Sequence, residues 1–173
     1  MVVWITGLAG SGKSTVGRLV YSDWKKADPA TVFVDGDEIR DVFRHNRGDE
    51  PYSLEGRRQN AERIASLCAW LDRQNINVVC CILSIFEETR NWNRENYEEY
   101  LEVYLHAPED VLASRRHLYN EAKEGKIKNV VGVDIPFTPP ENPDMVFESG
   151  PEGDSAEGIA EKVYDQIRQQ LGK

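Results

Sequence analysis

Residues 7–14 constrain the chain most, because they read G-L-A-G-S-G-K-S and fit the pattern G-x-x-x-x-G-K-[ST] at every fixed position. The apolar run Val2–Thr6 precedes them and is typical of a buried strand, and Val16, Leu19 and Val20 follow at helical spacing. A glycine loop between a strand and a helix points successive N–H groups at phosphate oxygens, and the helix N-terminus adds positive charge. The sequence therefore predicts a site for the phosphates of a nucleotide rather than an ordinary strand-to-helix turn.

Each part of this loop has a chemical reason. Glycine is required where a Cβ would block the curl of the backbone. Lys13 is placed to reach the β and γ phosphates and Ser14 to ligate Mg²⁺, so ATP and Mg²⁺ are the expected cofactors. The residues that we expect to contact ATP in this segment are Gly7, Gly10, Ser11, Gly12, Lys13, Ser14 and Thr15. The loop also fits GTPases, motor ATPases and nucleotide sensors, but the short chain favours a phosphotransferase.

Apolar segments alternate with helical segments along the rest of the chain. Further strands are predicted at Thr31–Val34, Asn77–Leu83, Tyr100–His106 and Met145–Phe147. Helices are predicted from Ser14 to about Trp24, from about Leu54 to Gln74, from Pro108 to about Arg116, and from an N-cap at Asp154 through Ile159, Val163, Ile167 and Leu171. Continuous apolar strands separated by helices predict an α/β fold of three layers, in which a parallel sheet carries helices on both faces.

The length of the chain and one unusual segment predict its organisation. The 173 residues are enough for a single compact domain, which we expect to span residues 1–173. Residues 118–143 are rich in Lys, Gly, Asn and Pro, and a connection that long in a compact domain is usually functional. We expect a lid from about residue 115 to about residue 143.

The charge and the cysteines exclude several classes of function. The chain has 21 basic and 30 acidic residues, a formal charge of −9, which argues against binding of nucleic acid or of anionic membranes. No apolar run approaches the ~20 residues of a membrane span and no signal peptide precedes the loop, so a cytoplasmic protein is expected. Cys68, Cys80 and Cys81 are odd in number and lack C-x-x-C spacing, so we expect buried, reduced thiols.

The segment D-G-D-E-I-R at residues 35–40 directly follows the second predicted strand. Ligands of parallel sheets bind beyond the carboxyl ends of the strands, so this segment is expected to face the glycine loop. Asp37 could accept a proton from an acceptor hydroxyl or help to position Mg²⁺, and Arg40 could grip an anionic group. The alternative is structural, with Asp37 as a helix N-cap and Arg40 on a solvated face. The spacing alone leaves both interpretations open.

Two further groups of polar residues are candidates for substrate contacts. The first precedes the long helix and consists of Tyr52, Arg57, Arg58 and Asn60. Arginine beside an aromatic ring suits the phosphate and base of a nucleotide, and a charged helix start is the alternative. The second group lies in and before the lid and consists of Arg115, Arg116, Lys123, Lys126 and Lys128. These cations could neutralise charge in a transition state, although we expect Lys123 and Lys126 to be solvated.

In combination these motifs resemble the adenylylsulfate kinase family, from about Val2 to Leu171. The loop G-L-A-G-S-G-K-S-T is close to the family's version, and residues 35–40 match its D-G-D-x-x-R segment. Arg57 and Asn60 stand where the family has a substrate-binding arginine and asparagine. The lid pattern of the family is followed by I-K-N at residues 127–129, by Gly132 and Asp134, and by Pro139 to Pro143.

The resemblance implies a sheet of strand order 2-3-1-4-5, a mobile lid and a homodimer. It implies Mg²⁺-dependent transfer of the ATP γ-phosphoryl group to the 3′-hydroxyl of a small-molecule nucleotide, adenylyl sulfate. Lys13 and Asp37 are then expected to be catalytic, and Asp37 would orient or deprotonate the hydroxyl. Arg115 or Arg116 is expected to contact the adenine of ATP. The expected substrate contacts are Asp37, Arg40, Tyr52, Arg57, Asn60, Leu83, Ser84, Lys128 and Val130.

The chain departs from the family at three places that concern substrate recognition or the lid. Tyr52 supplies one of the two rings that hold the substrate's adenine in the family, but Val130 stands at the position of the second ring. That loss could forfeit ~1–3 kcal/mol of base stacking. The family's I-S-P-[FY] reads L-S-I-F at residues 83–86, and its R-D-x-K-G-L-Y is shortened to R-R-H-L-Y at residues 115–119.

Three alternatives to an adenylylsulfate kinase follow. Val130 favours a relative that phosphorylates another nucleotide conjugate, such as cytidine diphosphoramidate, because a smaller pyrimidine needs less stacking area. A non-catalytic nucleotide-binding regulatory domain is the second alternative, and the intact Lys13, Ser14 and Asp37 argue against it. A small-metabolite kinase of the shikimate or gluconate type is the third, but the D-G-D-x-x-R segment with Arg57 and Asn60 favours a nucleotide acceptor.

Overall fold

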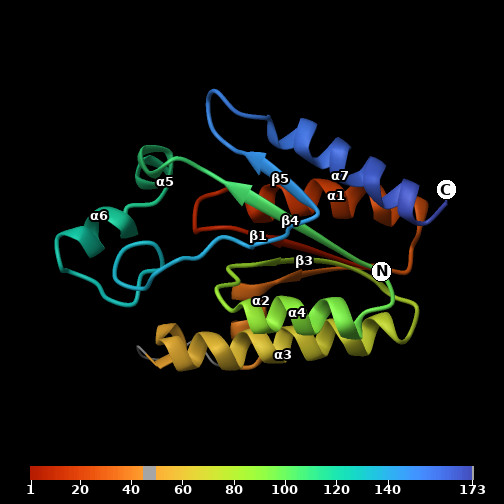
Figure 1. Ribbon diagram of the computed structural model, residues 1–173, viewed down its shortest axis with the longest axis horizontal. Coiled ribbons are helices and arrows are strands. Elements are labelled where there is room, and N and C mark those ends of the chain that lie inside the picture. The colour runs from red at the N-terminus through yellow and green to blue at the C-terminus, as the bar shows by residue number, and fades with distance from the viewer. Residues whose placement is uncertain (45–49, 173) are drawn as a thin grey trace.

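The computed structural model describes residues 1–44 and 50–172, and in this part of the chain a parallel sheet of five strands forms the centre (Figure 1). Across the sheet the order is β2-β3-β1-β4-β5. The strands are β1 (Val2–Thr6), β2 (Thr31–Asp35), β3 (Asn77–Ile82), β4 (Tyr100–His106) and β5 (Met145–Glu148). This arrangement confirms the predicted α/β fold and the strand order that the resemblance implied.

Helices cover both faces of the sheet. The helices of the described residues are α1 (Lys13–Ala27), α2 (Gly36–Val42), α3 (Leu54–Asp72), α4 (Glu87–Asn96), α5 (Glu109–Arg115), α6 (Leu118–Lys123) and α7 (Ala156–Gln170), and a 3₁₀ turn lies at Glu50–Tyr52. α1 and α7 lie on one face, and α3 and α4 lie on the other (Figure 1). Among the described helices, none combines the length and the apolar character that crossing a membrane requires.

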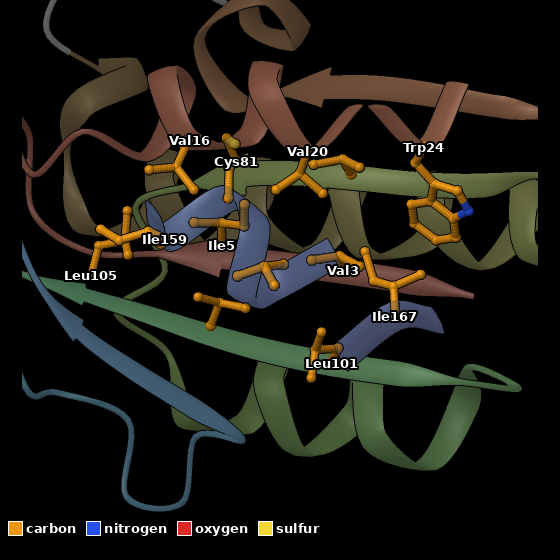
Figure 2. Packing of buried hydrophobic residues seen from close by; sticks show 14 of the residues in the cluster. Val3, Ile5, Val16, Val20, Trp24, Cys81, Leu101, Leu105, Ile159 and Ile167 are labelled. Carbon is orange, nitrogen blue, oxygen red and sulfur yellow. The ribbon is translucent and has the colours of Figure 1, made fainter. Parts of the chain in front are cut away.

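The first strand shows why its sequence is apolar at every position except its last, Thr6. Val3 and Ile5 point toward α1 and α7, where they pack in one buried cluster with Val16 (Figure 2). Val2 and Trp4 belong to the buried cluster on the opposite face, under α3. Because successive side chains of a strand alternate between the two faces of a sheet, a strand that is covered on both faces buries all of them.

The strands end together, which brings several functional segments to one edge of the sheet. Thr6 at the end of β1 pairs with Ile82 of β3 and with Tyr104 of β4. Asp35 at the end of β2 pairs with Cys81 of β3. The glycine loop, the D-G-D segment and the L-S-I-F segment therefore begin at the same edge, as expected for ligand-binding segments of a parallel sheet.

Helix α4 has no counterpart in the prediction from sequence. Its buried side chains are polar and include Arg90 and Asn93. Arg90 forms an ion pair with the buried Glu102 of β4 at 3.4 Å and donates a hydrogen bond to the carbonyl of Ser84 at 2.9 Å. A helix that buries a polar face through ion pairs has no apolar stripe, so hydrophobic periodicity could not find it.

The start of α7 differs from the prediction by one residue. The predicted N-cap Asp154 is wrong, because Ser155 is the cap and its Oγ accepts a hydrogen bond from the N–H of Gly158 at 3.1 Å. Asp154 instead pairs with Lys162 at 2.6 Å. The apolar repeat that begins at Ile159 predicts the helix, but it does not decide which of two adjacent capping residues begins it.

The predicted lid, residues 115–143, projects beyond the edge of the sheet at which β1 ends (Figure 1). It contains α6 and a tight turn in which the carboxylate of Asp134 accepts the backbone N–H groups of Asn129 and Val130, both at 2.6 Å. The segment is thus folded, and part of it lines the cleft described below. Its movement as a lid, and a single domain over residues 1–173, stay predictions.

Candidate active site

A cleft of about 740 Å³ opens at the edge of the sheet where β1, β2 and β3 end. Its volume is in the range of nucleotide-sized ligand sites. Most of the predicted site residues line it, namely Gly10, Ser11, Gly12, Lys13, Ser14, Thr15, Asp37, Arg40, Tyr52, Arg57, Leu83, Arg115, Arg116, Lys128 and Val130. Gly7, Asn60 and Ser84 are predicted site residues that do not line it. The structure therefore brings the glycine loop together with the predicted substrate contacts, which lie far from it in sequence.

The glycine loop follows a path that side chains would obstruct. Gly7 passes so close to the carbonyl oxygen of Leu105 in β4 that a Cβ would not fit there. Gly10 and Gly12 have φ angles of 86° and 92°, which residues with a Cβ rarely adopt. The three glycines thus carry the chain from the end of β1 into the first turn of α1 around a concave surface.

Lys13 is the first residue of α1, and its side chain folds back over the loop. Its Nζ donates a hydrogen bond to the carbonyl of Leu8 at 2.8 Å. Loss of water around the ammonium lowers the pKa of Lys13 to about 8, while the carboxylates of Asp37 and Asp35 act in the opposite direction. A triphosphate beside this ammonium would favour its charged form, so the position suits a phosphate contact.

Ser14 and Asp35 provide oxygen atoms that fit Mg²⁺. Ser14 Oγ donates to Asp35 Oδ2 at 2.6 Å, and the other oxygen of that carboxylate accepts the N–H of Asp37 at 2.9 Å and so caps α2. Mg²⁺ prefers such hard oxygen ligands and usually takes only one or two from the protein, with phosphates and water completing its shell. When bound, Mg²⁺ would neutralise charge on the phosphates. The sequence prediction named Ser14 as the Mg²⁺ ligand and gave Asp37 as a residue that could help to position the ion, but it did not name Asp35.

Asp37 and Arg40 face the loop from the first turns of α2. The Asp37 side chain is 85% exposed, and the buried Arg40 forms an ion pair with its carboxylate. The N-cap of α2 is Asp35, so the alternative reading of Asp37 as a cap and of Arg40 as a solvated residue is wrong in both parts. This carboxylate, held at one side by a buried arginine, is accessible to a ligand in the cleft.

Two guanidinium groups lie near the ring of Tyr52. That of Arg40 is 5.2 Å and that of Arg57 is 5.8 Å from the ring centroid. Arg57 also donates to the carbonyl of Asn129, in the predicted lid, at 2.8 Å. Burial and the charge of Arg40 lower the pKa of Arg57, so an anionic ligand beside both cations would be stabilised. This end of the cleft suits a phosphate and a base.

Asn60 and Ser84 do not reach the cleft, although both were predicted substrate contacts. Asn60 Nδ2 donates to the carbonyl of Gly36 at 3.5 Å, beneath the start of α2. The backbone N–H of Ser84 donates to Thr6 Oγ1 at 3.2 Å. Both residues are buried. They support the walls of the cleft, and their substrate contacts stay predictions.

Some residues that contact the loop were missed from the sequence. Asp35 belongs to the D-G-D segment, and its place at the end of a strand was the signal that could have found it. Tyr119 donates its hydroxyl to the carbonyl of Ala9 at 2.7 Å, and Ser149 donates to the carbonyl of Ser11 at 2.7 Å. Ser149 lies outside any motif, and Tyr119 ends the R-R-H-L-Y segment, where it had no predicted role. Only the fold reveals these contacts.

A family model described as adenylylsulphate kinase matches residues 1–148, which include the glycine loop, the D-G-D segment and the predicted lid. The chain belongs to the adenylylsulfate kinase family. Like the other members of this family, it is an ATP-dependent nucleotide kinase with a P-loop fold.

Individual relatives agree on the family and differ in the nucleotide that their names give. The adenylyl-sulfate kinase of Halothermothrix orenii is 33% identical over 171 residues, which cover 98% of this chain and 90% of the relative. The cytidine diphosphoramidate kinase of Campylobacter jejuni is 36% identical over 142 residues, which cover 81% of each chain. The structure of a Mycobacterium tuberculosis APS kinase in complex with AMPPNP and APS matches with a TM-score of 0.81 at 28% identity, over 96% of each chain.

Val130 stands in the predicted lid where the adenylylsulfate kinase family has an aromatic ring. This departure from the family bears most on which acceptor nucleotide can bind. Val130 is buried in an apolar cluster with Leu112 and Tyr119, and it also forms part of the wall of the cleft. Among the described residues that line the cleft, Tyr52 is the only one with an aromatic ring. A base bound there would stack on one ring rather than between two.

Proposed function

We propose that this chain transfers the γ-phosphoryl group of ATP to the 3′-hydroxyl of adenylyl sulfate. One observation carries the proposal: a single cleft has Lys13 and Ser14 on one side and Asp37, Arg40 and Tyr52 on the other. The first side suits a triphosphate with Mg²⁺, and the second suits a nucleotide that presents a hydroxyl. Two such sites in one cleft allow direct transfer between bound nucleotides, for which positioning is the main requirement.

ATP would bind on the side of the glycine loop. The backbone N–H groups of the loop and the start of α1 would hold the β and γ phosphates, and the ammonium of Lys13 would contact them directly. Ser14 and Asp35 would hold Mg²⁺. Arg115, which is anchored to the carbonyl of Gly10 at 3.0 Å, would lie toward the adenine.

The acceptor would bind with its 3′-hydroxyl beside Asp37. In the transfer, a bond forms between the 3′-oxygen and the γ-phosphorus while the bond from that phosphorus to the bridging oxygen of ADP breaks. The hydroxyl proton passes to the carboxylate of Asp37. Arg40 and Arg57 would hold the anionic group at the 5′ end of the acceptor, and Lys13 would offset charge on the transferred group.

A second candidate acceptor is cytidine diphosphoramidate, and one specific observation favours it. Val130 leaves the acceptor base with a single aromatic neighbour, Tyr52, among the described residues of the cleft. A pyrimidine loses less from a missing ring than a purine does, because it offers less area for stacking. The similarity to the Campylobacter jejuni enzyme agrees with this candidate.

A comparison of the two acceptors tests the proposal. The purified chain is incubated with ATP and Mg²⁺ and with increasing adenylyl sulfate or cytidine diphosphoramidate, and release of ADP gives kcat/KM for each. We expect turnover of adenylyl sulfate with the higher kcat/KM. A preference of more than about tenfold for the cytidine conjugate, equal to ~1.4 kcal/mol, would move the proposal to the second candidate. Turnover of neither would overturn both.

Two further expectations belong to this proposal. We propose that the enzyme works in the cytoplasm and as a homodimer, as its resemblance to the family implies. Light scattering of the purified chain, coupled to size exclusion, gives the mass in solution. A mass near twice the 19.7 kDa of the chain is the expected result.

A further inference from the structure

The carbonyl groups of the glycine loop are held by side chains from outside the loop. Three successive carbonyls, those of residues 9–11, each accept a hydrogen bond from one such side chain. The donors are, in order, Tyr119 at 2.7 Å, Arg115 at 3.0 Å and Ser149 at 2.7 Å. They come from α6, from the last residue of α5 and from the residue after β5, so three elements that are distant from the loop in sequence converge on it.

These contacts also determine where the N–H groups of the loop point. In a planar trans peptide the C=O and the following N–H point in opposite directions. A donor that holds the carbonyl of Ala9 therefore orients the N–H of Gly10, and a donor that holds the carbonyl of Ser11 orients the N–H of Gly12. The N–H of Ser11 is held inside the loop by the carbonyl of Leu8 at 3.1 Å. Glycine has the greatest conformational freedom of the amino acids. The contacts from outside the loop therefore restrict the backbone conformation most at Gly10 and Gly12.

Apolar contacts cover the same side of the loop. Leu8 and Ala9 pack against a buried cluster that includes Leu112 and Tyr119. The turn of the predicted lid at residues 129–134 also lies against Leu8, because a Cβ on Gly132 would lie 3.3 Å from a methyl group of Leu8. α5, α6 and the lid turn therefore form a surface against which the loop is packed.

We propose that Tyr119 and Ser149 are positioning residues that orient the N–H groups of Gly10 and Gly12 toward the phosphates before ATP binds. Arg115 holds the peptide between them, whose N–H stays inside the loop on the carbonyl of Leu8. The positioning role rests on the proposed function only in assigning a phosphate ligand to the loop. Donors that are already oriented bind an anion more tightly, because binding requires no reorganisation. Since Tyr119 belongs to the predicted lid, the shape of the loop depends on how the lid is placed.

The test is calorimetric titration with tripolyphosphate, which has neither a base nor an acceptor group. Tyr119→Phe removes one hydroxyl and keeps the ring, and Ser149→Ala removes the other hydroxyl. Each variant is expected to bind tripolyphosphate about 5- to 10-fold more weakly, the effect of losing one hydrogen bond. Tyr97→Phe is the matched control, because the Tyr97 hydroxyl donates to the carbonyl of Ala65 at 3.1 Å under α3, on the other side of the sheet. It should bind as the wild type does.

Unchanged affinity in Tyr119→Phe or in Ser149→Ala would overturn the proposal, and so would an equal loss in Tyr97→Phe. Urea unfolding of all four proteins establishes that each is folded under the conditions of the titration. The acceptor takes no part in this measurement. Absence of phosphoryl transfer would therefore not change the interpretation of the tripolyphosphate affinities. Unchanged tripolyphosphate affinities would likewise not change the interpretation of the transfer assay.

Discussion

Replacement of Lys13 by alanine is expected to lower kcat for phosphoryl transfer about 10³-fold, the size of effect seen when a group that offsets transition-state charge is removed. Lys13 lies in the cleft with its ammonium folded over the glycine loop, 2.8 Å from the carbonyl of Leu8. In the variant, no cation at this position would offset the negative charge on the γ-phosphoryl group and on the departing ADP. Release of ADP in a coupled assay, at saturating ATP and acceptor, measures the change.

Lys126→Ala is the matched control for this variant. Lys126 belongs to the predicted lid, its side chain is exposed, and it pairs with Glu124 at 2.6 Å. Its loss is expected to leave kcat unchanged, because exposed ion pairs contribute little. A Lys13→Ala enzyme that keeps more than about a tenth of the wild-type kcat would show that the loop binds a nucleotide without taking part in transfer.

Replacement of Asp37 by asparagine is expected to lower kcat about 10²- to 10⁴-fold, the usual contribution of a positioned proton acceptor. The amide keeps the size of the carboxylate but cannot take the proton of the 3′-hydroxyl. The KM for ATP should change little, since the glycine loop is untouched. Steady-state kinetics with each substrate varied in turn separate the two parameters.

The neighbouring residue Glu38 provides the control for Asp37. Its carboxylate pairs with Arg18 at 2.5 Å on the surface, so Glu38→Gln alters one carboxylate of the same helix outside the cleft. We expect wild-type kcat from it. If Asp37→Asn keeps kcat within about tenfold of the wild type, Asp37 only positions substrate and the proton leaves by another route.

The fold could be predicted from the sequence because the relevant signals are local. Val2–Ile5 is apolar because both faces of β1 are covered, and the glycine loop follows directly after Thr6. The other strands were predicted in the same way, from short apolar segments that alternate with helical segments along the chain. Helix α4 could not be predicted, since its buried face is polar and its Arg90 pairs with Glu102, a partner that only the folded chain brings near. A buried ion pair has no sequence period.

The candidate site was predictable to the extent that motifs carried it. Lys13, Asp37 and Arg57 lie in recognisable segments, and the structure places all three around one cleft. Ser149 lies in no motif, and Tyr119 ends the R-R-H-L-Y segment without a predicted role. The partners of both are backbone carbonyls rather than side chains. Contacts of that kind depend on where the backbone passes, so they follow from the tertiary structure alone.

The position of the transferred phosphate distinguishes a nucleotide 3′-kinase from an ATPase and from a kinase of another hydroxyl. The chain is incubated with ATP labelled with ³²P at the γ position, with Mg²⁺ and with each candidate acceptor, and the labelled product is purified and examined by ³¹P NMR. We expect one new phosphomonoester on the 3′-oxygen of the acceptor, formed in an amount equal to the ADP released. Label that appears only as inorganic phosphate, or at any other position of the acceptor, would contradict it.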